Sequence, residues 1–410
     1  MEFISEQGTY NCDELKNPEL YSAFTGQFEE AIDVALCRMM MEDTTVVPVT
    51  IKVKKVDDDG SYMFDVEGEN ILVTEPYIKD GEEQTVPLFS LESKREMKKI
   101  VDNISNGSIN LVRYSAKRGG VGRRYCDYGD NYNQQPNPSL TTISRNMRNT
   151  LYHYQGWKDF DFVASHPTIM SIIAKKLDIV TPRLDEWIDD KEPIIKLLSD
   201  HHSVKGHPAL QKDHIKKMIC MVLYGGGIQT WAKDVRDENS NELPMEVQKV
   251  ADGLDNFKDW RKIRAEHTHP YFNELKAECK VINERLWKHN REFRELVCDQ
   301  SRDESGQKSQ FISYYLGVIE NHCLYHAYNY FVNNDIIESR KCSLAYDGFT
   351  AKCNHAYTDF TFHLEECNKY ILEKTGFAMK LIDKEFDEST IQLPIINMRR
   401  DLPTAELAPT

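Results

Sequence analysis

Apolar and acidic residues alternate at the start of residues 157–176, and this pattern predicts a strand followed by a helix. Phe160 and Phe162 alternate with Asp159 and Asp161, which is the period of two expected of a half-buried β-strand. An apolar helical pattern with a proline near its start follows directly. The strand therefore carries a carboxylate to the point where a helix begins. Such a carboxylate can hold a cation, although a solvated aspartate before a capped helix gives the same pattern.

Two further stretches contain charged side chains in positions that are typical of binding or catalytic sites. Lys212 and Lys216 are four residues apart in a predicted helix, so they share one face, and Tyr224 falls near that face. The glycines that follow are equally typical of an ordinary helix end. Later, residues 341–352 predict a strand pair with Asp347 at its turn, and such a turn is also common in hairpins without a function.

The rest of the chain alternates between helical and strand-like patterns. We expect a helix over residues 17–41, a small antiparallel unit over 45–74 and an amphipathic helix over 90–104. The later part of the chain is mainly helical. A polar loop is expected over residues 299–308, followed by a long aromatic helix over 311–331.

The composition is that of a soluble globular protein. The chain has 410 residues, 40% hydrophobic and 29% charged, which is enough for a core and for two or three subdomains. Its formal net charge of -15 counts mildly against nucleic-acid binding, because nucleic-acid-binding surfaces are usually basic. Local basic groups could still line a groove on an acidic body: Lys117-Arg118, Arg123-Arg124, Lys212 with Lys216-Lys217, and Lys288 with Arg291 and Arg294.

The cysteines and the apolar runs indicate in which cellular compartment the protein is expected. Ten cysteines are scattered without a C-x-x-C pair, which favours reduced intracellular thiols over disulfides or a structural zinc. His322, Cys323 and His326 are close in sequence, but ordinary helix packing is the preferred interpretation. No run approaches the ~20 apolar residues of a membrane helix, and the acidic amino terminus is not a signal peptide.

Three segments taken together resemble motifs A, B and C of the family A DNA polymerases. They are Asp159-Phe160-Asp161 with His166-Pro167, the helix from Lys212 to Gly227, and the hairpin Ser343–Phe349. The divergent transposon–virus polymerases of virophages and related mobile elements are the most similar subgroup. The hairpin departs from the family pattern because Tyr346-Asp347-Gly348 stands where His-Asp-Glu is usual.

The resemblance implies an α+β fold of the right-hand type, with an antiparallel-sheet palm, helical fingers and a small amino-terminal α/β region. The expected division is a thumb-like or accessory region 1–110, a palm formed by 111–167 and 311–395, fingers 168–310, and a tail 396–410. In this division, glycine-rich turns and charged helix faces would bind DNA and nucleotides.

The same resemblance implies a catalytic site with two Mg²⁺ or Mn²⁺ ions. Asp161, Asp347 and the backbone carbonyl of Phe162 would hold the ions. Lys216 would stabilise and protonate the leaving pyrophosphate. Together with Lys212 it would bind the triphosphate.

Further residues are implied in substrate binding. Tyr224 would stack at the nascent base pair, and His166 stands where the family has a ribose-excluding glutamate, which suggests altered sugar selection. Arg123, Arg145, Arg148 and Tyr346 would contact DNA. From the residues alone, the glycine–arginine stretch around Arg123 is equally a flexible surface turn, and Arg145 and Arg148 are equally helix-surface charges.

The implied function is template-directed DNA synthesis in the replication of a virus or mobile element, with de novo primer synthesis by a primase-polymerase as the alternative. A two-metal nuclease and a non-catalytic DNA-binding replication accessory protein remain as alternatives of other classes. The expected partners are a DNA primer–template, nucleoside triphosphates and a candidate replicative helicase, with no membrane. The expected location is intracellular, in the cytoplasm or a viral replication compartment.

Overall fold

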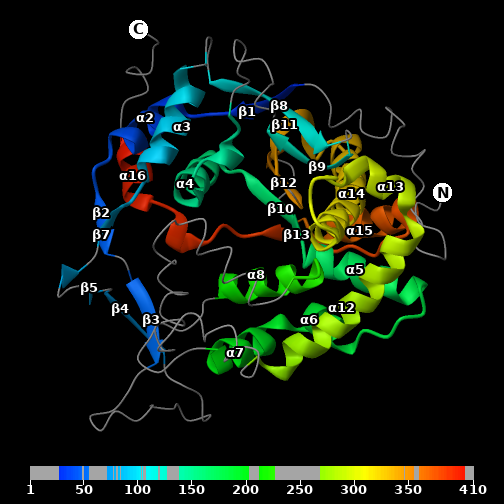
Figure 1. The fold of residues 1–410 in the computed structure, drawn as a ribbon. Coiled ribbons are helices and arrows are strands. Elements are labelled where there is room, and N and C mark those ends of the chain that lie inside the picture. Colours follow the sequence, from blue (N-terminus) through cyan, green and yellow to red (C-terminus); the bar gives the residue numbers. More distant parts are fainter. Residues whose placement is uncertain are drawn as a thin grey trace.

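The computed structural model describes most of the chain between residues 27 and 401 (Figure 1). The described residues are 27–48, 50–54, 72–76, 78–79, 82–83, 85–102, 104, 108–118, 121–126, 138–202, 212–226, 268–345, 347–354 and 360–401.

A four-stranded antiparallel sheet lies at the centre of these residues, with the strand order β11-β12-β10-β13. Its strands are β10 (Lys158–Phe162), β11 (Ile337–Leu344), β12 (Gly348–Cys353) and β13 (Leu381–Lys384). Phe160 and Phe162 of β10 are buried, whereas Asp159 and Asp161 are half-buried, as the alternation predicts. The predicted strand pair over residues 341–352 is also confirmed, as the β11–β12 hairpin.

Two helices, α14 (Glu304–Asn333) and α15 (Thr361–Thr375), cover the apolar face of this sheet. The ring of Phe160 lies 4.6 Å from that of Phe331 in α14 and 5.7 Å from that of Phe360, which precedes α15. The predicted loop over residues 299–308 is wrong for its second half. Asp303 accepts a 2.8 Å hydrogen bond from the Gly306 N–H and starts α14 there.

A second sheet has the order β1-β8-β9, with β1 (Gln27–Ala31), β8 (Ile109–Arg118) and β9 (Val121–Cys126). The helix predicted over residues 17–41 is therefore wrong where β1 lies. Phe28 and Glu30 are both buried, the strand period, and Asp33 then caps α2 (Val34–Glu42). Since β1 pairs with β8, residues on both sides of the predicted 110/111 boundary share a sheet, and the domain division stays a prediction.

Short two-stranded ladders and small helices complete the amino-terminal part and its surroundings. The ladders pair β2 with β7, β3 with β4, and β5 with β6. Their bounds are β2 Val46–Pro48, β3 Thr50–Lys54, β4 Leu72–Pro76, β5 Ile78–Lys79, β6 Glu82–Glu83 and β7 Thr85–Pro87. The other elements here are α3 Leu91–Asp102, η2 Leu140–Thr142, α4 Arg145–Gln155, η3 Glu388–Thr390 and α16 Leu393–Asp401. Together with α2, the helices α3, α4 and α16 enclose a second hydrophobic core.

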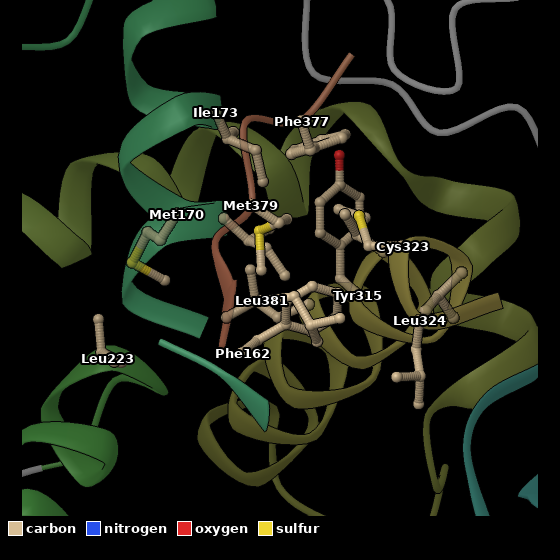
Figure 2. Close-up of a cluster of buried hydrophobic side chains, with 14 of the residues drawn as sticks. Phe162, Met170, Ile173, Leu223, Tyr315, Cys323, Leu324, Phe377, Met379 and Leu381 are labelled. Carbon is tan, nitrogen blue, oxygen red and sulfur yellow. The ribbon is translucent and has the colours of Figure 1, made fainter. Parts of the chain in front are cut away.

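The remaining helices are a group beyond the end of β10 and, apart from it, α13, which packs against α14 (Figure 1). They are α5 Ser165–Lys176, α6 Pro182–Asp189, α7 Lys191–His202, α8 Lys212–Leu223, α12 Pro270–His289 and α13 Arg291–Val297. Figure 2 shows how their apolar side chains join those of the sheet. Phe162 of β10, Met170 of α5 and Leu223 of α8 belong to one buried cluster. This mixture of helices and antiparallel strands is compatible with the α+β class, and the right-hand arrangement stays a prediction.

Candidate site at the acidic strand ends

The two carboxylates singled out by the sequence lie at neighbouring strand ends. Asp161 of β10 pairs in register with Gly348, the residue after Asp347. The Phe162 N–H donates a 3.0 Å hydrogen bond to the backbone carbonyl of Asp347. A Cβ at Gly348 would lie 2.1 Å from the Phe160 carbonyl oxygen, so the close approach of β12 to β10 requires glycine there.

Lys384, which no sequence pattern indicates, faces these acids from β13. Its Nζ lies 2.5 Å from Asp161 Oδ2. Burial alone would lower the pKa of Lys384, but attraction to Asp161, Asp159 and Asp347 outweighs it and leaves the pKa raised. All three carboxylates therefore act on one ammonium group.

Asp159 and Arg148 extend this cluster along β10 towards α4. Burial raises the pKa of Asp159, and repulsion from Asp161 adds to this. The charges of Lys384 and Arg148 oppose the shift, as does a 3.2 Å hydrogen bond from the Thr350 hydroxyl. Arg148, predicted as a phosphate contact, thus lies near the acids, and it donates a 3.3 Å hydrogen bond to the Thr141 carbonyl.

The next feature is the set of side chains that could act as ligands for the predicted metal ions. Within the residues that the structure describes, no three His, Cys, Asp or Glu side chains lie close enough together to hold an ion between them. A pair of carboxylates nevertheless suits Mg²⁺, which proteins commonly bind through one or two carboxylates together with ligand phosphates. Asp161 and Asp347 are carboxylates of this kind, but Asp161 is already paired with the ammonium group of Lys384. The two-ion site stays a prediction.

His166 lies in a buried network just beyond β10. Its side chain is 4% exposed, with Nδ1 2.5 Å from the Tyr224 hydroxyl and Nε2 3.3 Å from a carboxylate oxygen of Glu320. Glu320 is fully buried and also accepts a 2.7 Å hydrogen bond from Ser165. His166 and Tyr224, predicted as separate nucleotide contacts, are therefore joined to each other, and they link α5, α8 and α14.

The basic face predicted on α8 is present. Lys212 is exposed and Lys216 half-buried. Lys212 forms an ion pair with Glu192 of α7. The hydrogen bond from Lys212 lowers the pKa of Glu192, and the charges of Lys212 and Lys216 add to it. Both ammonium groups thus lie near Glu192 on one side of the helix.

For some of the other predicted site residues the structure describes only the backbone, or nothing at all. Arg145 is the exposed first residue of α4. Arg123 lies in β9, but its side chain is outside the described residues, as is the whole of Tyr346. The side chain of Phe162 belongs to the core (Figure 2). The predicted metal-binding role of its carbonyl stays a prediction.

Comparison with known proteins changes the functional interpretation. No protein-family model matches the chain. It is 22% identical over 314 residues to the protein named "Putative helicase V13" of Sputnik virophage. The match covers 75% of this chain and 34% of that protein, so the chain spans about a third of the length of its relative.

This similarity contradicts the function expected from the three motifs. The relative is named a helicase, so the predicted template-directed DNA polymerase is wrong, and so is its primase-polymerase alternative. The three motifs correctly predict the strand β10, the helix α8 and the β11–β12 hairpin. Their resemblance to the family A polymerases does not predict the activity. Among the helices that the structure describes, none has the length and apolar character needed to cross a membrane.

Proposed function

We propose that this chain is a nucleic-acid-binding, nucleotide-acting part of a helicase-type protein in viral DNA replication. The similarity to the helicase-named virophage protein supports the helicase class and the viral setting. Because the match covers 34% of that protein, the proposal concerns one part of such an enzyme. The chain would work there on the phosphates of DNA or of nucleotides.

The sequence limits which part this can be. No glycine is followed by lysine anywhere in the 410 residues, so the chain lacks a phosphate-binding loop of the G-x-x-x-x-G-K-[ST] type. That loop holds the nucleotide phosphates in P-loop motors. We therefore assign to this chain the contact with nucleic acid and nucleotide, and not the ATP-driven motor.

The arrangement around β10 is the single observation that carries this assignment. In this proposal a divalent cation binds at the Asp161–Asp347 strand ends, and the charge of Arg148 acts on Asp159 of the same strand as Asp161. A cation shared between carboxylates and phosphate, with a guanidinium nearby, is a common way to bind a phosphate-bearing ligand. Lys216 on α8 supplies a further positive charge.

Binding of a fluorescent single-stranded oligonucleotide, measured by anisotropy at several salt concentrations, tests the proposal. We expect the affinity to fall steeply with salt, because each phosphate contact contributes about 0.7 to the slope of log affinity against log salt. Arg148→Gln and Lys216→Gln should each lower that slope by about this amount. Lys369→Gln is the matched control, because Lys369 is an exposed lysine on α15, which covers the apolar face of the sheet.

Two results would contradict the assignment. One is an oligonucleotide affinity that does not depend on salt. The other is an equal effect of the Lys369 control and the two site variants. Thermal unfolding of each variant shows whether it remains folded, so a lost contact can be distinguished from a damaged protein.

A further inference from the structure

A cavity of about 420 Å³ lies at the end of the central sheet that is remote from Asp161. Glu29 and Ala31 of β1 line one side, residues at the ends of β11 and β12 line another, and Trp157 lines it just before β10 begins. Trp157 precedes Asp161 by four residues, which along a strand is about 13 Å. The cavity is therefore separate from the acidic strand ends, and its volume is within the range of about 300–1,000 Å³ that is usual for small-molecule sites.

A bulge in β11 forms one wall of the cavity. Two stretches of regular pairing between β11 and β12 are separated by residues 338–341, which lie opposite Lys352 alone. Arg340 in this bulge has a φ of 63°, in the left-handed region that residues other than glycine rarely adopt. Its N–H donates a 2.6 Å hydrogen bond to the Tyr328 hydroxyl, which holds the bulge in place. Bulges redirect side chains and are common beside binding sites, and this one places Lys341 at the cavity together with Lys352.

The charged groups of the lining are balanced in number but differ in their partners. Lys341 Nζ lies 2.5 Å from a carboxylate oxygen of Glu338, and both side chains are more than half exposed. Glu338, and to a smaller extent Glu29, raise the pKa of Lys341. Lys352 is exposed and has no ion-pair partner among the residues that the structure describes. Lys352 is thus available to an anionic group of a ligand, whereas the two glutamates can accept hydrogen bonds from ligand hydroxyl or amino groups.

Trp157 adds a rigid apolar wall and a hydrogen-bond donor. Its side chain is 4% exposed, and its ring stacks on that of Tyr152 with the centroids 5.0 Å apart. The buried indole N–H has no acceptor within the described part of the chain. A buried donor without an acceptor is costly, and a ligand that brings an oxygen to it removes that cost. Ile109 of β8, which pairs with Ala31, adds a second apolar surface.

We propose that this cavity binds a nucleoside monophosphate. The phosphate would pair with Lys352, the flat base would pack against Ile109 and Trp157, and ligand hydroxyl or amino groups would donate to the two glutamates. A simple anion would leave the apolar wall and the glutamates unused. The inference does not rest on the proposed function, because no residue of this lining belongs to the Asp161–Asp347 strand ends.

Isothermal titration calorimetry of the full chain with AMP, GMP, CMP and UMP tests the proposal, with the matching nucleosides and inorganic phosphate as comparisons. At least one nucleoside monophosphate should bind at least about tenfold more tightly than its nucleoside and than inorganic phosphate, because each of these offers only part of the contacts. Failure of all four to bind would overturn the proposal. So would a nucleoside or inorganic phosphate that binds as tightly as the nucleotide.

Two variants test whether the nucleotide binds in this cavity. Lys352→Gln removes the charge that pairs with the phosphate and should weaken binding about tenfold. Ala31→Phe fills the cavity and should abolish binding, whereas Lys369→Gln on α15 should leave the affinity unchanged. An unchanged affinity in either Lys352→Gln or Ala31→Phe would overturn the assignment. Thermal unfolding checks that each variant is folded, and Ser108→Phe fills the same cavity should Ala31→Phe be unstable.

Discussion

At Gly348 the chain passes so close to β10 that a Cβ would lie 2.1 Å from the Phe160 carbonyl oxygen. This contact lets the backbone of Asp347 accept a hydrogen bond from Phe162. The sequence identifies both aspartates, because each stands at the end of a recognisable strand. It does not identify Lys384, since only the register of β13 against β10 brings that lysine to Asp161.

His322 gives a pH-dependent prediction at the scale of one residue. Burial lowers its pKa to about 3, and the neighbouring His326 contributes. The unfolded chain takes up a proton near pH 6.5, whereas folded His322 stays neutral, so stability is lost as the pH falls below that value. At pH 5.5 this loss is about 1 kcal/mol. His322→Leu should therefore lose less stability than the wild type between pH 7 and pH 5 in denaturant titrations.

The control for this prediction is His153→Gln, because His153 lies exposed on α4. Its stability should follow the wild-type pH dependence. A wild type and a His322→Leu variant with parallel pH profiles would show that His322 does not carry this linkage.

At the scale of elements, periodicity predicts β10, the β11–β12 hairpin and α8 because each has one clear repeat. It fails at β1, where Phe28, Ile32 and Leu36 are spaced by four and match a helix as well. The pairing of β1 with β8 decides for the strand. That pairing depends on contacts between distant parts of the chain, which a local pattern does not contain.

Glu30 of β1 is the second feature that the pattern does not reveal. Its buried carboxylate accepts hydrogen bonds from Asn110 and Tyr114 of β8, from Ser139 and Leu140 near η2, and from Ser343 of β11. Burial raises its pKa, and hydrogen bonds led by those from Ser139 and Ser343 oppose the shift. One side chain thus connects the small sheet to the central one.

Removing that carboxylate should destabilise the protein strongly. Glu30→Ala leaves several buried donors unsatisfied, and we expect a loss of about 3–5 kcal/mol in the free energy of unfolding. Glu29→Ala is the control, because the neighbouring side chain points to the other face of β1 and is only half-buried. Chemical denaturation measures both. Equal losses in the two variants would show that the Glu30 network does not hold the sheets together.

At the scale of the whole molecule, net charge and short motifs are weaker guides than local geometry. The charge of -15 belongs to the whole chain. Locally, the positive charge of Arg148 acts on Asp159 and that of Lys216 acts on Glu192. The three motifs resembling polymerases suggest one function, and the similarity to the helicase-named virophage protein contradicts it. Order and spacing of motifs therefore predicted elements correctly without predicting the activity.

The most direct test of the account is whether a divalent cation strengthens nucleic-acid binding through Asp161. The affinity for a single-stranded oligonucleotide is measured by anisotropy with Ca²⁺ and with a chelator, at constant ionic strength. The wild type should bind about tenfold more tightly with Ca²⁺. Asp161→Asn should lose this gain, and Asp189→Asn, a change at an exposed aspartate of α6, should keep it. A wild type indifferent to Ca²⁺, or an Asp161→Asn variant that keeps the full gain, would contradict the account.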